Sequence, residues 1–124
     1  MMKYLRILAG AAAVLFMLTG IAWLVFPSFV ATQLGMTLLS GVGLSTQIGD
    51  LASFFLTLGS CVMIGLITSK REWFYPAIML LSIAAVGRIL SWLFHDAALA
   101  LDMIAVEAIT AVLFYAVSVK LAET

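Results

Sequence analysis

The apolar run at residues 74–94 constrains the fold most, because it is long enough to cross a lipid bilayer and yet carries Arg88. A guanidinium keeps its proton inside proteins, and placing one in hydrocarbon is energetically costly. Arg88 therefore needs carboxylate partners on other apolar segments. The chain offers three such residues, Asp50, Asp102 and Glu107. The run thus predicts a membrane protein in which several helices pack around one intramembrane cation.

The composition supports a membrane class. Of the 124 residues, 65% are hydrophobic and 10% are charged, and the mean hydropathy is +1.25. Soluble domains are about half apolar and about a quarter charged. Six basic and six acidic residues cancel without forming a basic tract, which argues against nucleic-acid binding. Cys61 is the single cysteine, and the sequence has no Cys/His cluster with ligand spacing, so it predicts no metal site.

The apolar runs predict an all-α fold, an integral membrane four-helix bundle that forms a single domain over residues 1–124. The start of the chain has the basic residues of a signal peptide, but the length of its apolar run favours a retained helix. We expect the four helices at about residues 4–26, 48–68, 74–94 and 98–121.

Local signals predict how these helices begin, end and pack. Pro27 ends the first helix, and Asp96 is the expected N-cap of the fourth. The segment between the first two helices is too rich in glycine for a span and too apolar for a solvated loop. It therefore predicts a short interfacial helix followed by irregular chain. Small residues on the first helix favour close packing within the chain over a dimer interface: Ala9, Gly10, Ala13 and Gly20.

Basic residues predict the orientation in the membrane. Four spans bring both termini to one side, and the two loops expected at the opposite side contain no lysine or arginine. By the positive-inside rule both termini are cytoplasmic. The five basic residues on the terminal side are Lys3, Arg6, Lys70, Arg71 and Lys120.

Polar side chains on helices two to four form a candidate ligand site. At helical spacing, a polar stripe on the second helix spans roughly 100°, and Asp102 points roughly 140° away from Glu107 on the fourth. The expected ligand-binding residues are Asp50, Thr57, Arg88, Trp92 and Glu107. Intramembrane ionisable residues suggest function by default, whereas a buried arginine–carboxylate network can also simply fix helix register. Both interpretations stay open.

Two sequence segments resemble a known family. Residues 49–60 (GDLASFFLTLGS) and 87–115 (GRILSWLFHDAALALDMIAVEAITAVLFY) are similar to the small four-helix bacterial membrane proteins of the DoxX-like kind, and closest to a related family of unknown function. The shared features are Asp50-Leu51, Gly87-Arg88, Asp96 and Glu107. The family often has an arginine directly after Asp-Leu, where this chain has Ala52. The resemblance implies a location in the bacterial cytoplasmic (inner) membrane. Relatives are linked to thiosulfate–quinone or other redox complexes, and a distant branch resembles a receptor-assembly chaperone.

Three functions are compatible with these residues. The first is a non-catalytic membrane protein, acting as an accessory subunit or as a binder of a small amphipathic ligand, either a lipid or a quinone. The alternatives are an intramembrane enzyme that uses Glu107 or Asp50 as general acid or base on a lipid-like substrate, and an oligomeric proton-coupled transporter. The expected partners are the lipid bilayer, such a ligand, and a membrane-protein partner or a second copy. We expect no cofactor, since the single histidine His95 cannot supply bis-histidine haem ligation.

Overall fold

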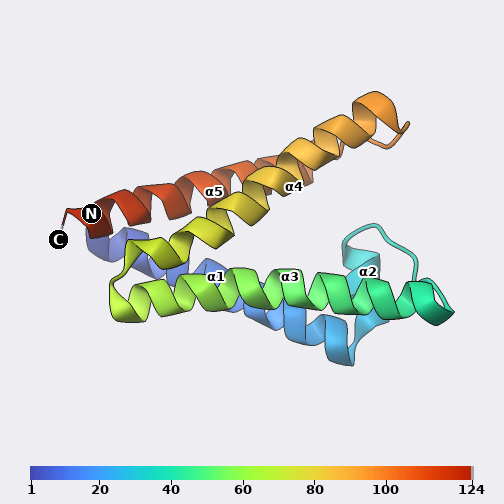
Figure 1. The fold of residues 1–124 in the computed structure, drawn as a ribbon, viewed down its shortest axis with the longest axis horizontal. Helices are drawn as coiled ribbons and strands as arrows, with labels where there is room; N and C mark the ends of the chain where they lie inside the picture. The colour runs from blue at the N-terminus through green and yellow to red at the C-terminus, as the bar shows by residue number, and fades with distance from the viewer. Residues whose placement is uncertain (124) are drawn as a thin grey trace.

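A computed structural model of the chain describes residues 1–123, which form helices joined by turns (Figure 1). Four segments are long and apolar enough to cross a membrane: Met2–Val25, Gly41–Thr68, Arg71–Phe94 and Leu101–Ala122. The predicted all-α four-helix bundle of a multi-pass membrane protein is therefore confirmed. The helical elements are α1 (Met2–Val25), α2 (Pro27–Gln33), α3 (Gly41–Thr68), the 3-10 helix η1 (Arg71–Phe74), α4 (Tyr75–Phe94) and α5 (Leu101–Ala122).

The four long helices form two pairs. The most extensive packing joins α1 to α3, the next joins α4 to α5, and α3 packs much less on α4. In Figure 1 the pairs lie close together at the end that holds both termini and diverge toward the other end. The main core lies where the pairs meet and includes Leu58, Phe74, Leu81 and Phe114. Residues of all four long helices line a cleft in this diverging half of the bundle, and the candidate site lies there.

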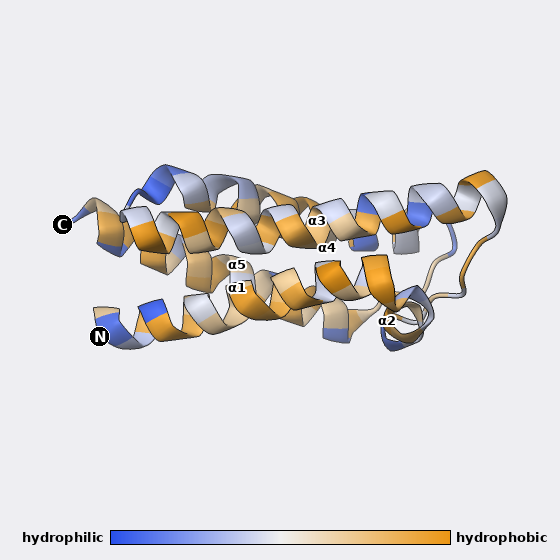
Figure 2. Ribbon diagram, turned by 90° about the horizontal axis from the view of Figure 1, so that it is seen from below, coloured by the Kyte–Doolittle hydropathy of each residue, from blue (hydrophilic) through white to orange (hydrophobic). Residues whose placement is uncertain are grey.

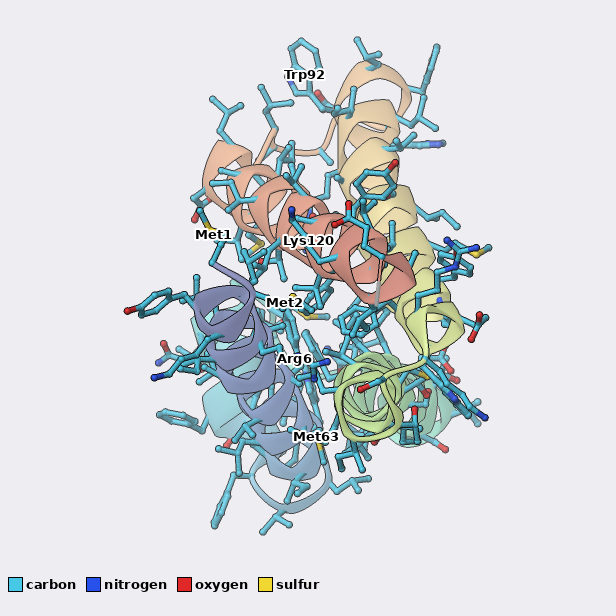
Figure 3. All side chains as sticks on the ribbon, turned by 90° about the vertical axis from the view of Figure 1, so that its left-hand side faces the viewer. Met1, Met2, Arg6, Met63, Trp92 and Lys120 are labelled. Atoms are coloured by element: carbon cyan, nitrogen blue, oxygen red, sulfur yellow. The ribbon has the colours of Figure 1, made fainter. Side chains whose placement is uncertain are left out.

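Basic residues lie at the terminal end of the bundle. Figure 2 shows hydrophilic residues toward both ends of the bundle and mainly hydrophobic ones along the middle of the long helices. Figure 3 looks onto the same end, with Arg6 and Lys120 labelled on α1 and α5. Arg6 joins the start of α1 to the end of α3, because its Nη1 donates to the Leu66 carbonyl at 3.2 Å and its Nη2 to Ser69 Oγ at 3.3 Å.

Small residues allow α1 and α3 to approach closely. A Cβ atom added at Gly20 would lie 2.9 Å from the backbone nitrogen of Leu56, and one added at Gly59 would lie 2.9 Å from that of Met17. Both distances are shorter than real Cβ contacts. Ala9 and Ala13 are fully buried in the core. The small positions of the first helix thus serve packing within the chain, as expected.

The segment between α1 and α3 (residues 26–40), which we call the interfacial segment, contains the short helix that the sequence predicted, but α3 begins earlier than expected. Pro27 opens α2 at its first position, and α3 starts at Gly41 rather than near residue 48. The buried side chain of Gln47 holds the intervening chain in place. Its Oε1 accepts a hydrogen bond from the Leu39 N–H at 2.9 Å, and its Nε2 donates to the Thr37 carbonyl at 3.1 Å. These bonds satisfy backbone groups that would otherwise be exposed near the membrane surface.

The prediction that Asp96 caps the fourth helix is wrong. Helix α5 begins at Leu101, its N-cap is Ala100, and no side chain caps it. Asp96 has a left-handed conformation (φ 59°) directly after α4, and the next N–H, of Ala97, donates to the Ser91 carbonyl at 3.2 Å. Aspartate is among the few residues that tolerate this conformation. Asp96 therefore ends α4 instead of starting α5.

Candidate functional site

A cleft of about 700 Å³ lies between the two helix pairs. All four long helices and the interfacial segment contribute to its walls. The volume falls within the range of small-molecule sites, which are mostly apolar with a few placed polar groups. The apolar walls include Leu15, Phe16, Phe54, Phe55, Leu81 and Val106, and the polar lining consists of Thr19, Gln33, Arg88, Asp102 and Glu107. We call this space the interpair cleft.

An ion pair joins α4 to α5 inside the interpair cleft. Arg88 Nε donates to Glu107 Oε1 at 2.9 Å. The Glu107 side chain is 12% exposed, whereas that of Arg88 is 35% exposed. Charge-assisted hydrogen bonds of this length are the stronger kind, and the surrounding apolar walls reduce solvent screening. Glu107 is thus the partner that an intramembrane guanidinium requires.

Two charged groups of the interpair cleft keep capacity for further bonds. Within residues 1–123, Arg88 is bonded through Nε alone, so its two terminal nitrogens have no protein acceptor. Asp102 lines the same cleft from the first turn of α5, is exposed, and has no hydrogen bond or ion pair in the described chain. The helix N-terminus favours a carboxylate at that position. Ligand groups that enter the cleft would therefore meet both donors and an acceptor.

Asp50 and Thr57 lie in a different place from the ion pair. They line a shallower pocket of about 340 Å³ together with Ser53, Phe54 and Leu80, on α3 and α4. Phe54 borders both pockets. The expected gathering of Asp50, Arg88 and Glu107 around one cavity is therefore not what the structure has. Asp50 and Thr57 are exposed, and Ser53 donates to the carbonyl of Gly49, one turn earlier in α3, at 2.7 Å.

Trp92 is separated from the other predicted site residues. Its side chain is 47% exposed and lines neither pocket, and Figure 3 shows it pointing outward at the periphery of the bundle. An aromatic ring in that position suits the lipid–water interface near the end of α4. The predicted ligand residues thus fall into two pairs in separate pockets, Arg88 with Glu107 and Asp50 with Thr57, and Trp92 lies apart from both. Within residues 1–123, no group of three His, Cys, Asp or Glu side chains is arranged to hold a metal ion.

The polar residues of the cleft that the sequence did not single out are Thr19 and Gln33. Thr19 is the one serine or threonine of α1, and Gln33 ends α2 in the interfacial segment. A polar residue within an otherwise apolar span was the available signal for Thr19. Gln33 gave no comparable signal, because its place on the cleft depends on the chain folding back after α1.

Comparisons with models of protein families, with curated proteins and with solved structures find no match for this chain. The resemblance to the DoxX-like proteins therefore stays a prediction, carried by the few residues that suggested it. What is established is the class of protein: an all-α chain whose four long apolar helices form the bundle of a multi-pass membrane protein.

Proposed function

We propose that this protein is a non-catalytic membrane protein that binds a small amphipathic ligand, a lipid or a quinone, in the interpair cleft. The cleft itself carries the proposal, because it combines apolar walls with one ion pair and spare hydrogen-bonding capacity. The ligand's tail would pack against residues such as Phe16, Phe55 and Leu81. Its polar head would meet Arg88 and Asp102.

The ion pair favours binding over the alternative of acid/base catalysis. A general base must be free to accept a proton from the substrate, and Glu107 instead accepts a hydrogen bond from a permanent cation. Asp50 is exposed in a separate, shallower pocket, away from that cation. The role of an accessory subunit stays compatible with ligand binding, since a cofactor-like lipid or quinone can be held for a partner protein.

Native mass spectrometry with a cleft-filling variant tests this proposal. Ala84 is half-buried on α4 and lines the interpair cleft, so Ala84→Trp is expected to fill much of it. We expect the protein from mild detergent to carry a bound amphiphile, and Ala84→Trp to lose most of that occupancy. The matched control is Ala105→Trp, which adds the same ring at an exposed position of α5 outside the cleft lining. Equal occupancy in the two variants would contradict the proposal.

We further propose that the protein resides in the cytoplasmic membrane of a bacterium, is related to the DoxX-like proteins, and has both termini in the cytoplasm. The resemblance supports the location and relationship. The positive-inside rule supports the orientation, because Lys3, Arg6, Arg71 and Lys120 lie at the terminal end of the bundle with the termini.

Cysteine labelling checks the orientation. In a Cys61→Ser background, Asp96→Cys is expected to react with a membrane-impermeant thiol reagent added to intact cells. Lys70→Cys is expected to react only after permeabilisation, because it lies in the turn between α3 and η1 at the opposite end from Asp96. Labelling of position 70 in intact cells would contradict the proposed orientation and place the termini outside the cytoplasm.

A further inference from the structure

The charges that line the interpair cleft do not cancel. Arg88 supplies one positive charge, while Glu107 and Asp102 supply two negative charges in their ionised forms. Glu107 is paired with Arg88 at 2.9 Å, so the excess negative charge resides on Asp102. The other cleft-lining polar residues, Thr19 and Gln33, are neutral. An occupant with a positively charged head would therefore complete the charge balance.

We propose that the interpair cleft selects amphiphiles whose head group carries an ammonium, which pairs with Asp102. The inference rests on the proposed function and names the ligand class for the same site. An ammonium offers three donors and no acceptor, which matches a carboxylate that has no other partner within residues 1–123. The terminal nitrogens of Arg88 remain available to a neutral acceptor on the same head, such as a hydroxyl or an ester carbonyl.

Anionic heads are the disfavoured class. A fatty-acid carboxylate could bind the terminal nitrogens of Arg88, but it would lie beside Glu107, which already occupies Nε of that guanidinium. A third carboxylate would then share a partly water-excluded space with two others and one cation, and like charges in such a space repel strongly. The apolar walls contribute equally to every head group with the same tail. Selectivity therefore depends on the charges.

Three probes with the same twelve-carbon tail isolate the effect of the head: dodecylamine, dodecanol with a deuterated tail, and dodecanoate. They are offered together, at equal concentration and neutral pH, to the full-length protein in a neutral detergent, and bound masses are read by native mass spectrometry. We expect about tenfold more bound amine than bound alcohol, because one charge-assisted hydrogen bond contributes about that factor in affinity. The carboxylate is expected to bind least.

Matched variants assign the preference to one residue. In Asp102→Asn the ratio of amine to alcohol is expected to fall to about one with alcohol binding unchanged, and Asp102→Glu should restore the preference. Asp96→Asn is the control, because Asp96 is an exposed carboxyl near the same end of the bundle and does not line the cleft.

The outcomes separate this inference from the proposed function. If dodecanoate binds best, or if the amine preference persists in Asp102→Asn, the head-group assignment is overturned while the cleft remains a ligand site. If none of the three probes binds and the wild-type protein carries no amphiphile that Ala84→Trp removes, both proposals fail.

Discussion

Arg88→Leu is expected to destabilise the protein by roughly 2–4 kcal/mol, whereas Arg88→Leu combined with Glu107→Leu is expected to cost under about 1 kcal/mol. The single change leaves Glu107 without its partner in a side-chain environment that is only 12% exposed. The double change removes both charges and replaces them with apolar side chains. The expected loss of stability in Arg88→Leu lies slightly below the usual range for breaking a buried pair, because 35% of the Arg88 side chain is exposed. The free energy of unfolding, measured by titrating sodium dodecyl sulfate into mixed micelles, checks both values.

The surface pair between Lys120 and Glu123 is the control for this experiment. Its atoms are 3.7 Å apart, and the two side chains are 45% and 60% exposed. Lys120→Leu is therefore expected to change stability by less than about 1 kcal/mol. Glu107→Leu alone should cost less than Arg88→Leu, since the long Arg88 side chain can extend toward water in the open cleft. A double variant as unstable as Arg88→Leu would mean that the two residues do not stabilise each other.

Gly59→Ala is expected to destabilise the bundle by about 3 kcal/mol, near the top of the usual range for overpacking. The new Cβ would lie 2.5 Å from the carbonyl oxygen of Ala13 and 2.9 Å from the nitrogen of Met17, both backbone atoms of α1. Backbone cannot move aside as a flexible side chain can, so α1 would have to separate from α3. The α1–α3 contact is the most extensive helix–helix contact of the fold.

Gly49→Ala in the same helix provides the matched comparison. An added Cβ at Gly49 has no atom within 4 Å among the described residues, so no neighbour opposes it. Alanine is also the better helix former by up to about 1 kcal/mol, so this variant is expected to be neutral or slightly stabilising. The same unfolding titration applies to both variants. If Gly59→Ala were as stable as Gly49→Ala, the close approach of α1 and α3 described above would be incorrect.

The two predictions concern separate requirements of the site. The α1–α3 contact, with Gly20 and Gly59 at its closest points, holds one wall of the interpair cleft. The Arg88–Glu107 bond holds the other, because it joins α4 to α5. Each of these two interactions lies within one helix pair, so neither of them joins one wall of the cleft to the other. Ligand binding therefore should stabilise the bundle by linking pairs that otherwise meet mainly near the termini.

The amino-acid sequence by itself determined the membrane class, the four spans and the helix break at Pro27. Hydrocarbon forces every backbone group of a span into local hydrogen bonds, so length and composition alone identify the helices. The same signals were weaker at the membrane surface, where α3 extends back to Gly41 and Asp96 closes α4. Those boundaries depend on contacts such as the one between Gln47 and the chain at Leu39.

Only the tertiary structure decided which carboxylate pairs with Arg88. The sequence offered Asp50, Asp102 and Glu107 on two helices, and the pattern along each helix does not specify which helices are neighbours. Glu107 is the partner because α5 packs along α4 with that face turned inward. Asp50 is not, because α3 diverges from α4 toward the end where Asp50 lies. The divergence that separates Asp50 from Arg88 also creates the interpair cleft, and helix rotation and splay of this kind arise from packing rather than from the pattern of any single run.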